Sequence, residues 1–273
     1  MKNKILIFGR GFIARRLEKE LDCILSERKI YSLSDADEEI RKFSLGIIIN
    51  SIGYIGRNVD DCELDKDKAL MSNAFVPLIL GEAALRNKIR LIHISSGCIY
   101  NFDYSKDRPI NESKVPDYFN LFYSRTKIYS EQPLKILSEK YPILIVRIRI
   151  PLDNRPSHKN ILTKLIGYKN SIIDLPNSVT YIPDFIKALK HLIKINARGI
   201  YNVVNKGGLR YADLLDIYQK YIPGFKYRVV DYKDLRIERT NLILSVRKLE
   251  SSGFKIRGIR EVLEECVIEY LKY

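Results

Sequence analysis

Four side chains near the middle of the chain have the chemistry to move protons: Ser96, Cys98, Tyr123 and Lys127. Tyr123 and Lys127 form a Y-x-x-x-K pair at the start of a predicted helix, so the phenol and the ammonium project on the same side. A neighbouring ammonium favours the phenolate, which lowers the tyrosine pKa and lets the hydroxyl exchange a proton near neutral pH. Ser96 ends a predicted strand, where its hydroxyl can hydrogen-bond the same substrate oxygen. These residues predict proton transfer at a carbonyl or alcohol group.

A glycine-rich turn lies near the start of the chain, in the segment ILIFGRGFIARRL. Gly9, Gly11 and Ala14 have G-x-G-x-x-A spacing between an apolar strand and a helix, which is typical of dinucleotide binding. Gly9 allows the tight turn, Gly11 lets backbone N–H groups approach a pyrophosphate, and Ala14 lets the helix pack on the strand. An ordinary strand-to-helix turn is the structural alternative. The predicted cofactor contacts at this turn are Gly9, Arg10, Gly11, Phe12 and Ile13.

The segment DCILSERKI, at the end of the second predicted strand, bears on which dinucleotide binds. An NAD enzyme usually offers an acidic residue there for the ribose hydroxyls, and Glu27 has the right position. Arg28 and Lys29 supply cations for the 2′-phosphate of NADP, and Arg10 can join them. We therefore predict NADP(H), with Arg28 as a contact of the phosphate. Two alternatives stay open: Glu27 holds the ribose of NAD(H), or Arg28 and Lys29 are solvated loop charges.

Apolar runs of strand length alternate with amphipathic helical stretches over the first 150 residues. This alternation predicts an α/β fold, a doubly wound parallel sheet of the Rossmann type with helices on both faces. The predicted strands are 4–8, 45–50, 90–95 and 142–147, and the predicted helices are 12–21, 62–86 and 123–140.

From Pro151 onward the alternation becomes less regular, and prolines are frequent. We predict two domains: residues 1–150 bind the dinucleotide, and residues 151–273 are mainly a smaller substrate-binding lobe interleaved with the last Rossmann elements. Two short segments in that lobe, 201–204 and 227–230, have strand-like patterns, and a helix over 258–271 closes it.

Composition and charge exclude several classes of protein. The chain has 273 residues, 46% of them hydrophobic, and its 47 Lys+Arg against 33 Asp+Glu give a net charge of +14. The basic residues alternate with acidic ones instead of forming a block, so we predict no nucleic-acid partner. No apolar run reaches about 18 residues, and Met1 to Lys4 lead directly into a strand, so we expect a cytoplasmic protein without membrane spans. Four scattered cysteines and three histidines suggest neither disulfides nor a metal site.

The chain resembles the extended short-chain dehydrogenase/reductases over nearly its whole length. Within that family it is similar to the enzymes that complete nucleotide-activated L-rhamnose, including bifunctional 3,5-epimerase/4-reductases and simple 4-reductases. It departs from their pattern in a glycine turn that is one residue shorter than G-x-x-G-x-x-G, and in Leu244-Ser245 where Leu-Asp is usual. The matching segments are IINSIGYIGRNVDDCE, SNAFVPLILGEAAL, HISSGCIYNFD, FYSRTK, VRIRIPLD, ILTKLIGYKNSIIDLPNSVT, GIYNVVN and RTNLILSVRKL.

The resemblance implies a role for individual residues. Ser96, Tyr123 and Lys127 would form the reductase triad, with Lys127 also holding the nicotinamide ribose. The substrate diphosphate would be held by Arg239, whose planar guanidinium suits bidentate contact with phosphate oxygens; a surface arginine is the alternative. The remaining implied residues are Asn50, Ser51, Gly53 and Asn73 at the cofactor and Asn177 at the substrate.

Cys98 distinguishes two kinds of enzyme in this family. The resemblance implies that a cysteine just past the catalytic serine is an acid/base for epimerisation, with Lys164 as its partner on the other face of the sugar. In a 4-keto-6-deoxyhexose the protons on C3 and C5 are next to the ketone, so a base can remove one and an acid can return it to the opposite face. His158 is an alternative to Lys164. The structural alternatives are a buried, packed Cys98 and a surface lysine.

The sequence therefore predicts an NADPH-dependent 3,5-epimerase/4-reductase that converts a nucleoside-diphospho-4-keto-6-deoxyglucose, with UDP as the expected nucleotide, into an L-rhamnose-type nucleotide sugar. One alternative is a 4-reductase that works after a separate epimerase. Another is a non-catalytic nucleotide-binding regulatory subunit of the same fold. A homodimer is compatible with each of these hypotheses.

Overall fold

The computed structural model describes residues 4–234 and 238–273. The chain forms two compact units, and each is considered by itself. Unit 1 comprises residues 1–99, 116–147 and 192–201, and unit 2 comprises residues 100–115, 148–191 and 202–273. The sequence analysis used Met1 to Lys4 to predict a protein without a leader segment, and residues 1–3 lie outside the described residues. The assignment of 1–150 to the cofactor and of 151–273 to the substrate stays a prediction.

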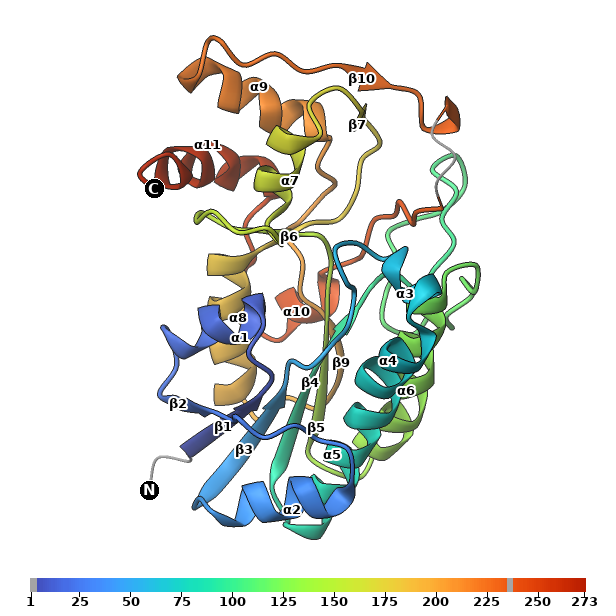
Figure 1. Ribbon diagram of the computed structural model, residues 1–273, viewed down its shortest axis with the longest axis vertical. Helices are drawn as coiled ribbons and strands as arrows, with labels where there is room; N and C mark the ends of the chain where they lie inside the picture. Colours follow the sequence, from blue (N-terminus) through green and yellow to red (C-terminus); the bar gives the residue numbers. More distant parts are fainter. Residues whose placement is uncertain (1–3, 235–237) are drawn as a thin grey trace. The chain divides into compact units, whose positions relative to one another are not determined.

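Unit 1 is built on a six-stranded sheet with the strand order β2-β1-β3-β4-β5-β9. Strand β1 pairs in parallel with β2 and β3, and β3 pairs in parallel with β4. The register places Phe8 of β1 beside Asn50 of β3, and Asn50 beside His93 of β4. Parallel neighbours end at one edge, so the loops after these strands meet there (Figure 1). The strands are β1 (Lys4–Phe8), β2 (Cys23–Leu25), β3 (Leu45–Asn50), β4 (Arg90–Ser96), β5 (Ile143–Ile148) and β9 (Gly199–Asn202).

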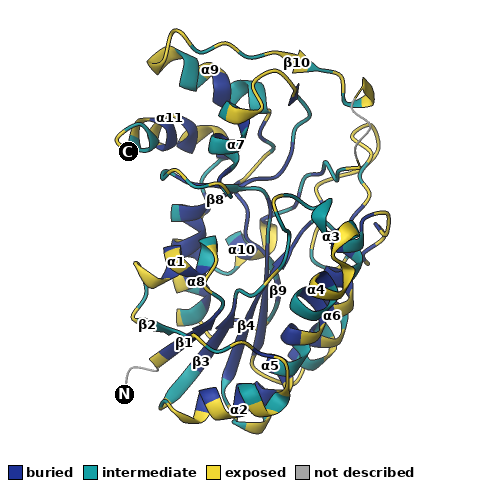
Figure 2. Ribbon diagram, in the orientation of Figure 1, coloured by how far each residue is buried: buried dark blue, intermediate teal, exposed yellow. Residues whose placement is uncertain are grey.

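Helices cover both faces of this sheet, as the predicted doubly wound fold requires. The chain moves from β1 to its neighbour β2 on one side, and then from β2 past β1 to β3 on the other side. Because these two connections run in opposite directions along the sheet, right-handed crossovers place α1 and α2 on opposite faces. On the face of α2, the side chains of α5 and α6 complete an apolar core in which the strands are buried (Figure 2). The helices are α1 (Phe12–Glu18), α2 (Leu33–Arg41), α5 (Val76–Arg86) and α6 (Phe122–Ser138). The predicted fold class is confirmed.

The predicted single helix over 62–86 is wrong. Asp65 has a non-helical backbone (φ −122°, ψ 57°) that separates α3 from α4, and a π-helical turn then precedes α5. Such turns often mark functional positions, and this one carries Asn73. The apolar periodicity continues through these breaks, which is why the sequence pattern did not show them. The pieces are α3 (Asp61–Leu64), α4 (Lys66–Leu70) and the π turn η1 (Met71–Phe75).

The stretch Lys66–Arg86 is the one candidate membrane span among the described residues, by length and composition. Half of its most apolar 18 residues are buried, and core helices of soluble proteins have the same length and composition. In the structure, Val76, Leu80 and Ala83 of this stretch pack in the core against the sheet. The apolar composition of this stretch is therefore explained by packing.

Unit 2 has its own apolar core, formed by side chains of α7, α9 and α11 together with short strands. Its two-stranded sheets pair β6 with β8 and β7 with β10, both in parallel. The predicted closing helix over 258–271 corresponds to α11. The elements are β6 (Pro151–Leu152), α7 (Ile161–Gly167), β7 (Ile172–Ile173), β8 (Thr180–Tyr181), α8 (Ile182–Lys194, which continues into unit 1), α9 (Tyr211–Tyr221), β10 (Val229–Val230), the 3₁₀ turn η2 (Tyr232–Asp234), α10 (Arg247–Ser251) and α11 (Ile259–Tyr270).

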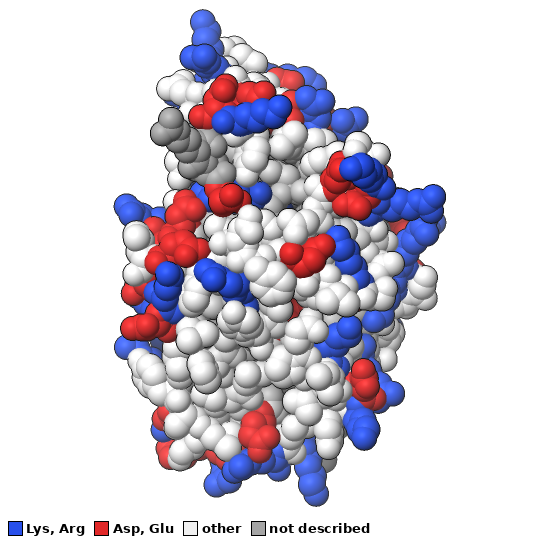
Figure 3. Space-filling model, turned by 90° about the vertical axis from the view of Figure 1, so that its right-hand side faces the viewer, with Lys and Arg blue, Asp and Glu red and all other residues white. Residues whose placement is uncertain are grey.

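Charged side chains of both signs are mixed on the surface. On the face in Figure 3, Lys and Arg lie beside Asp and Glu, and broad areas carry neither. This face has no continuous basic stripe of the kind that tracks a nucleic-acid backbone.

Candidate functional site

The glycine turn leaves space at the start of α1. Gly9 has φ +104°, and a Cβ there would lie 2.8 Å from Oγ of Ser51, so this position needs glycine. Ser51 follows β3, and both its N–H (2.9 Å) and its hydroxyl (3.0 Å) donate to the carbonyl oxygen of Phe8. A Cβ at Gly11 would meet nothing within 4 Å. The turn thus packs against the loop after β3 on one side and is open at Gly11, which fits a pyrophosphate.

The loop after β3 is held by buried amide side chains. The Asn50 amide nitrogen lies 3.2 Å from Nδ1 of His93, and Oδ1 of Asn50 accepts from the N–H of Ile52 at 3.0 Å. Asn73, on the π turn, accepts from the N–H of Tyr54 and donates to its carbonyl oxygen, both at 2.8 Å. These two asparagines fix the backbone of residues 50–54.

This loop also passes close to the lysine of the Y-x-x-x-K pair. A Cβ at Gly53 would lie 3.3 Å from Oδ1 of Asn73 and 3.4 Å from Nζ of Lys127. The predicted cofactor residues Gly53 and Asn73 therefore lie beside Lys127.

Tyr123 and Lys127 lie in the first turns of α6. No side chain of the N-cap residue caps this helix; instead the carboxylate of Glu63 accepts from the N–H of Phe122 at 2.6 Å, which suits the positive end of a helix. Lys127 Nζ lies 5.8 Å from the centre of the Tyr123 ring. The predicted same-side arrangement of the two side chains is present.

The environment of Lys127 shifts its proton affinity. The side chain is buried, and this burial lowers the pKa from 10.5 to about 8, while Cys62, Cys98 and Glu131 act in the opposite direction. Because an ammonium with such a pKa can lose a proton near neutral pH, Lys127 suits a proton-transfer site.

Ser96 and Cys98 lie at the carboxyl end of β4. The Ser96 hydroxyl oxygen accepts from the N–H of Cys98 at 3.2 Å, which fixes the side chain at the end of the strand. Cys98 is half-buried and packs in a small cluster with Tyr123 and Cys62. Burial raises the pKa of the Cys62 thiol to about 11, so this second thiol stays protonated. No motif or spacing in the sequence pointed to Cys62 as part of this cluster.

Lys164 and Arg239 both belong to unit 2, and they are close enough for the charge of Arg239 to act on Lys164. Lys164 lies on α7, whose start is capped by Asn160. Its pKa is lowered by burial and further by the positive charges of Lys159 and Arg239. The Arg239 backbone N–H donates to the Tyr232 hydroxyl at 3.0 Å. Three cations thus lie near one another in unit 2, which suits an anionic group. The alternative acid/base His158 is exposed.

Asn177 is buried and holds the segment that follows Arg239. Its Oδ1 accepts from Nη2 of Arg149 at 2.6 Å and from the N–H of Leu242, and its amide nitrogen donates to the Thr240 carbonyl oxygen and to Asn241. A contact between Asn177 and substrate stays a prediction, and it requires one of these bonds to break.

The cations proposed for a 2′-phosphate are paired with carboxylates. Arg10 lies 2.7 Å from Glu27, and Nη2 of Arg28 lies 2.9 Å from both Asp35 and Glu38. The sequence analysis did not anticipate α2, which carries both carboxylates that hold Arg28. A 2′-phosphate would have to compete with these carboxylates for the guanidinium groups.

The structure brings together one set of predicted residues in unit 1 and another in unit 2. It also shows two buried residues that the sequence analysis missed, Glu131 on α6 and Arg147 on β5. Glu131 follows Lys127 by four residues, and Arg147 is a charged residue inside an apolar strand, so both carried a signal. Among the described residues, no group of three or more His, Cys, Asp or Glu could hold a metal ion. The unit 1 set is Ser96, Cys98, Tyr123 and Lys127 with Gly53 and Asn73, and the unit 2 set is Lys164 and Arg239.

Comparisons with known proteins identify the family to which the chain is similar. The profile of the family described as RmlD substrate binding domain matches residues 4–171. A trifunctional UDP-glucose 4,6-dehydratase/UDP-4-keto-6-deoxy-D-glucose 3,5-epimerase/UDP-4-keto-L-rhamnose-reductase of Arabidopsis thaliana is 27% identical over 97% of this chain, which spans 42% of that relative's length. A bifunctional dTDP-4-dehydrorhamnose 3,5-epimerase/dTDP-4-dehydrorhamnose reductase of the same plant is 28% identical, covering 81% of this chain and 76% of the relative.

A solved structure shows the same fold. The dTDP-4-dehydrorhamnose reductase of Bacillus anthracis, determined in complex with NADP, superposes with a TM-score of 0.82. It is 22% identical, and the match covers 98% of this chain and 100% of that one.

Proposed function

Because the chain belongs to the RmlD substrate binding domain family, we propose that it is an NADPH-dependent enzyme of nucleotide-sugar metabolism that epimerises C3 and C5 of a nucleoside-diphospho-4-keto-6-deoxyglucose and reduces C4. The product is an L-rhamnose-type nucleotide sugar. UDP is the proposed nucleotide, since the trifunctional plant relative is named for UDP sugars. We place the enzyme in the cytoplasm, as the sequence analysis predicts.

The observation that carries this proposal is the cluster at Tyr123. Lys127 lies one helical turn away, and Cys98 packs in the same apolar cluster while its N–H is bound by Ser96. A reduction needs a proton donor at the C4 oxygen, and Tyr123 supplies it, with Ser96 orienting the oxygen. A reductase alone has no need of a thiol beside that tyrosine.

The epimerisation uses the acidity of protons next to the ketone. The Cys98 thiolate removes a proton from C3 or C5, which leaves an enolate whose oxygen is held by the Tyr123 and Ser96 hydroxyls. Cys98 keeps the proton it has removed, and an acid on the opposite face of the sugar donates a different proton to that carbon, which inverts its configuration; Lys164 is the proposed acid. Its pKa is lowered toward neutrality by burial and by two neighbouring cations.

The residues at the glycine turn fit a dinucleotide. Gly11 leaves open space at the start of α1, and Gly53 brings the loop after β3 close to Lys127. NADPH, when bound, supplies the hydride for C4. The proposed contacts are Gly9, Arg10, Gly11, Phe12, Ile13 and Arg28 at the turn and the second strand, and Asn50, Ser51, Gly53, Asn73, Tyr123 and Lys127 beyond it.

A 4-reductase without epimerase activity is the second candidate, and one observation favours it. Lys164 lies near Lys159 and Arg239, and such a cluster of cations suits the substrate diphosphate as well as it suits an acid. If Lys164 binds phosphate, Cys98 has no partner on the opposite face and the chain acts on an already epimerised sugar.

One assay separates the two candidates. The purified protein is incubated with NADPH and either UDP-4-keto-6-deoxyglucose or the same sugar previously epimerised at C3 and C5, and the dTDP sugars are tested in parallel. The proposal predicts NADPH oxidation with both forms and one L-rhamnose product. Oxidation with only the epimerised form identifies a 4-reductase, and no oxidation with any of these sugars contradicts both candidates.

A further inference from the structure

A buried ion pair lies behind Lys127. Nε of Arg147 donates to both carboxylate oxygens of Glu131 at 3.1 Å, and Nη2 donates to Oε1 at 2.5 Å. The Ser95 hydroxyl donates to Oε2 of the same carboxylate at 2.7 Å. Glu131 is 0% exposed and Arg147 is 1% exposed. The carboxylate thus connects three elements: α6, one turn beyond Lys127; β5; and the end of β4, directly before Ser96.

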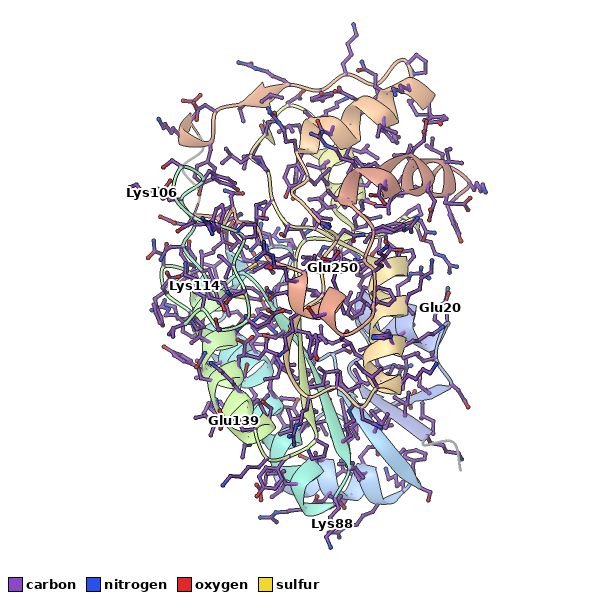
Figure 4. The ribbon with its side chains drawn as sticks, turned by 180° about the vertical axis from the view of Figure 1, so that it is seen from behind. Glu20, Lys88, Lys106, Lys114, Glu139 and Glu250 are labelled. Carbon is purple, nitrogen blue, oxygen red and sulfur yellow. The ribbon has the colours of Figure 1, made fainter. Side chains whose placement is uncertain are left out.

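Stability alone does not explain this pair. Removing two charges from water is costly, and replacement of a buried ion pair by apolar side chains is often neutral or stabilising. Several other charges of unit 1 stay in water: Lys88 and Glu139 lie at the rim of the ribbon (Figure 4), and Glu82 pairs with Arg86 on the exposed surface of α5. A buried carboxylate next to the proposed site points to a role for its charge and its position.

We propose that Glu131 is a positioning residue: its carboxylate, held by Arg147, sustains the ammonium form of Lys127 and fixes the end of β4 through Ser95. The first role concerns a charge, and the second concerns the placement of Ser96. The second role rests on the proposed function, whereas the first can be measured without any substrate.

The groups that face Lys127 come from several elements. Cys62 of α3 and Cys98 after β4 are thiols, Tyr123 precedes Lys127 on α6, and His93 of β4 is fully buried. Burial and the charge of Lys127 lower the pKa of His93 well below its usual value, so the ring is neutral. The carboxylate among these neighbours is that of Glu131, and its negative charge opposes the effect of burial on Lys127.

The experiment on the charge measures the titration of Lys127 directly. The protein is labelled with ¹³C at the lysine ε-carbons and followed by NMR. The resonance that is absent from the spectrum of the Lys127→Met variant belongs to Lys127. We expect a midpoint near pH 8 in the parent, and Glu131→Gln should lower it by about one pH unit because an attractive charge is lost. The matched control is Glu82→Gln, which removes a carboxylate from the exposed pair with Arg86 and should leave the midpoint unchanged.

A second variant covers the risk that Glu131→Gln does not fold with an unpaired buried arginine. Glu131→Gln with Arg147→Gln removes both charges and keeps polar side chains, and the midpoint should still fall because the carboxylate that raises the Lys127 pKa is lost. Folding of each variant is checked by circular dichroism. A midpoint equal to that of the parent in either folded variant would overturn the role of the charge.

Ser95→Ala tests the placement of Ser96, since it removes one hydroxyl and leaves the ion pair whole. We expect kcat for NADPH oxidation with the epimerised 4-keto sugar to fall several-fold while KM and the Lys127 midpoint stay constant. An unchanged kcat would refute this part of the proposal. If the parent reduces none of these sugars, the proposed function fails, and the lysine titration still decides the role of the charge.

Discussion

Two lysines in the two units have lowered pKa values, but their neighbours differ. Lys127 in unit 1 is buried, and the carboxylate of Glu131 supports its ammonium form against that burial. Lys164 in unit 2 is half-buried, and Lys159 and Arg239 add like charges that lower its pKa further. An anion beside a buried lysine raises the lysine pKa and keeps the side chain charged, whereas cations beside a lysine lower its pKa and also favour an anionic ligand. The two regions compared are the proton-transfer region of unit 1, Tyr123 with Lys127, and the cation cluster of unit 2, in which Arg239 is the proposed contact of the diphosphate and Lys164 the proposed acid.

The largest expected effect concerns the proton-transfer region. Tyr123→Phe keeps the packing of the ring and removes the proton donor, so kcat for NADPH oxidation with the epimerised sugar should fall by roughly 10²-fold or more. Binding of NADPH, measured by its fluorescence, should change little. Activity within a few-fold of the parent would remove Tyr123 from the mechanism.

The second prediction concerns stability. At pH 7 the folded chain holds Lys127 charged in a buried position, so Lys127→Met should abolish reduction and yet stabilise the fold, by at most about 3 kcal/mol for a pKa lowered from 10.5 to about 8. The unfolded parent binds more protons than the folded parent between these two pH values, so the parent gains stability as pH rises through this window and the difference between the two proteins shrinks. Thermal unfolding at pH 7 and pH 10 measures both effects. A Tm of Lys127→Met that lies below the parent's Tm at pH 7 would contradict the prediction.

The third prediction concerns Arg239 in the cation cluster of unit 2. Arg239→Gln should raise KM for the nucleotide sugar by about tenfold or more, because a charge-assisted contact is lost, while kcat changes little. The same change should raise the pKa of Lys164, since one neighbouring cation is gone. Arg260→Gln, on an exposed ion pair with Asp213 in the same unit, is the matched control and should leave KM as it is. An equal rise of KM in both variants would refute the assignment.

The smallest expected effect concerns the choice of cofactor. Arg28 already pairs with Asp35 and Glu38. Its net contribution to NADPH binding is therefore only the difference in free energy between its contact with the 2′-phosphate and its contacts with these carboxylates. Arg28→Gln should therefore narrow the preference for NADPH over NADH only by about three- to tenfold. Dissociation constants of the two cofactors, measured for the parent and the variant, test this. A preference of the parent for NADH would show that Glu27 holds the ribose instead.

The sequence predicted features that depend on local pattern. Strand β1 and strand β3 have the predicted bounds, and α6 begins one residue before the predicted start. The Y-x-x-x-K pair and the glycine turn are local too, because four residues of helix or a short turn fix their geometry. This is why the residues of the proton-transfer region could be named without coordinates.

Features that the apolar pattern and short motifs do not specify were missed. The carboxylates that engage Arg28 lie on α2, and Arg147, the partner of Glu131, lies 16 residues away on strand β5. The non-helical Asp65 and the π turn that carries Asn73 interrupt an apolar pattern which by itself predicts one helix. Tertiary packing decided each of these, and the sequence pattern does not encode it locally.

The incorporation of deuterium tests the central claim most directly. The parent protein receives NADPH and the unepimerised UDP-4-keto-6-deoxyglucose in deuterated water, and the product is analysed by mass spectrometry and NMR. We predict label at C3 and C5. Cys98→Ser should lose label at one or both positions, because a hydroxyl is a far weaker acid than a thiol near neutral pH, and it should still reduce the epimerised sugar. Cys23→Ser, on the edge strand β2, which β1 and β3 separate from β4, should label like the parent. A parent protein that reduces only the epimerised sugar and leaves C3 and C5 without deuterium would contradict the claim.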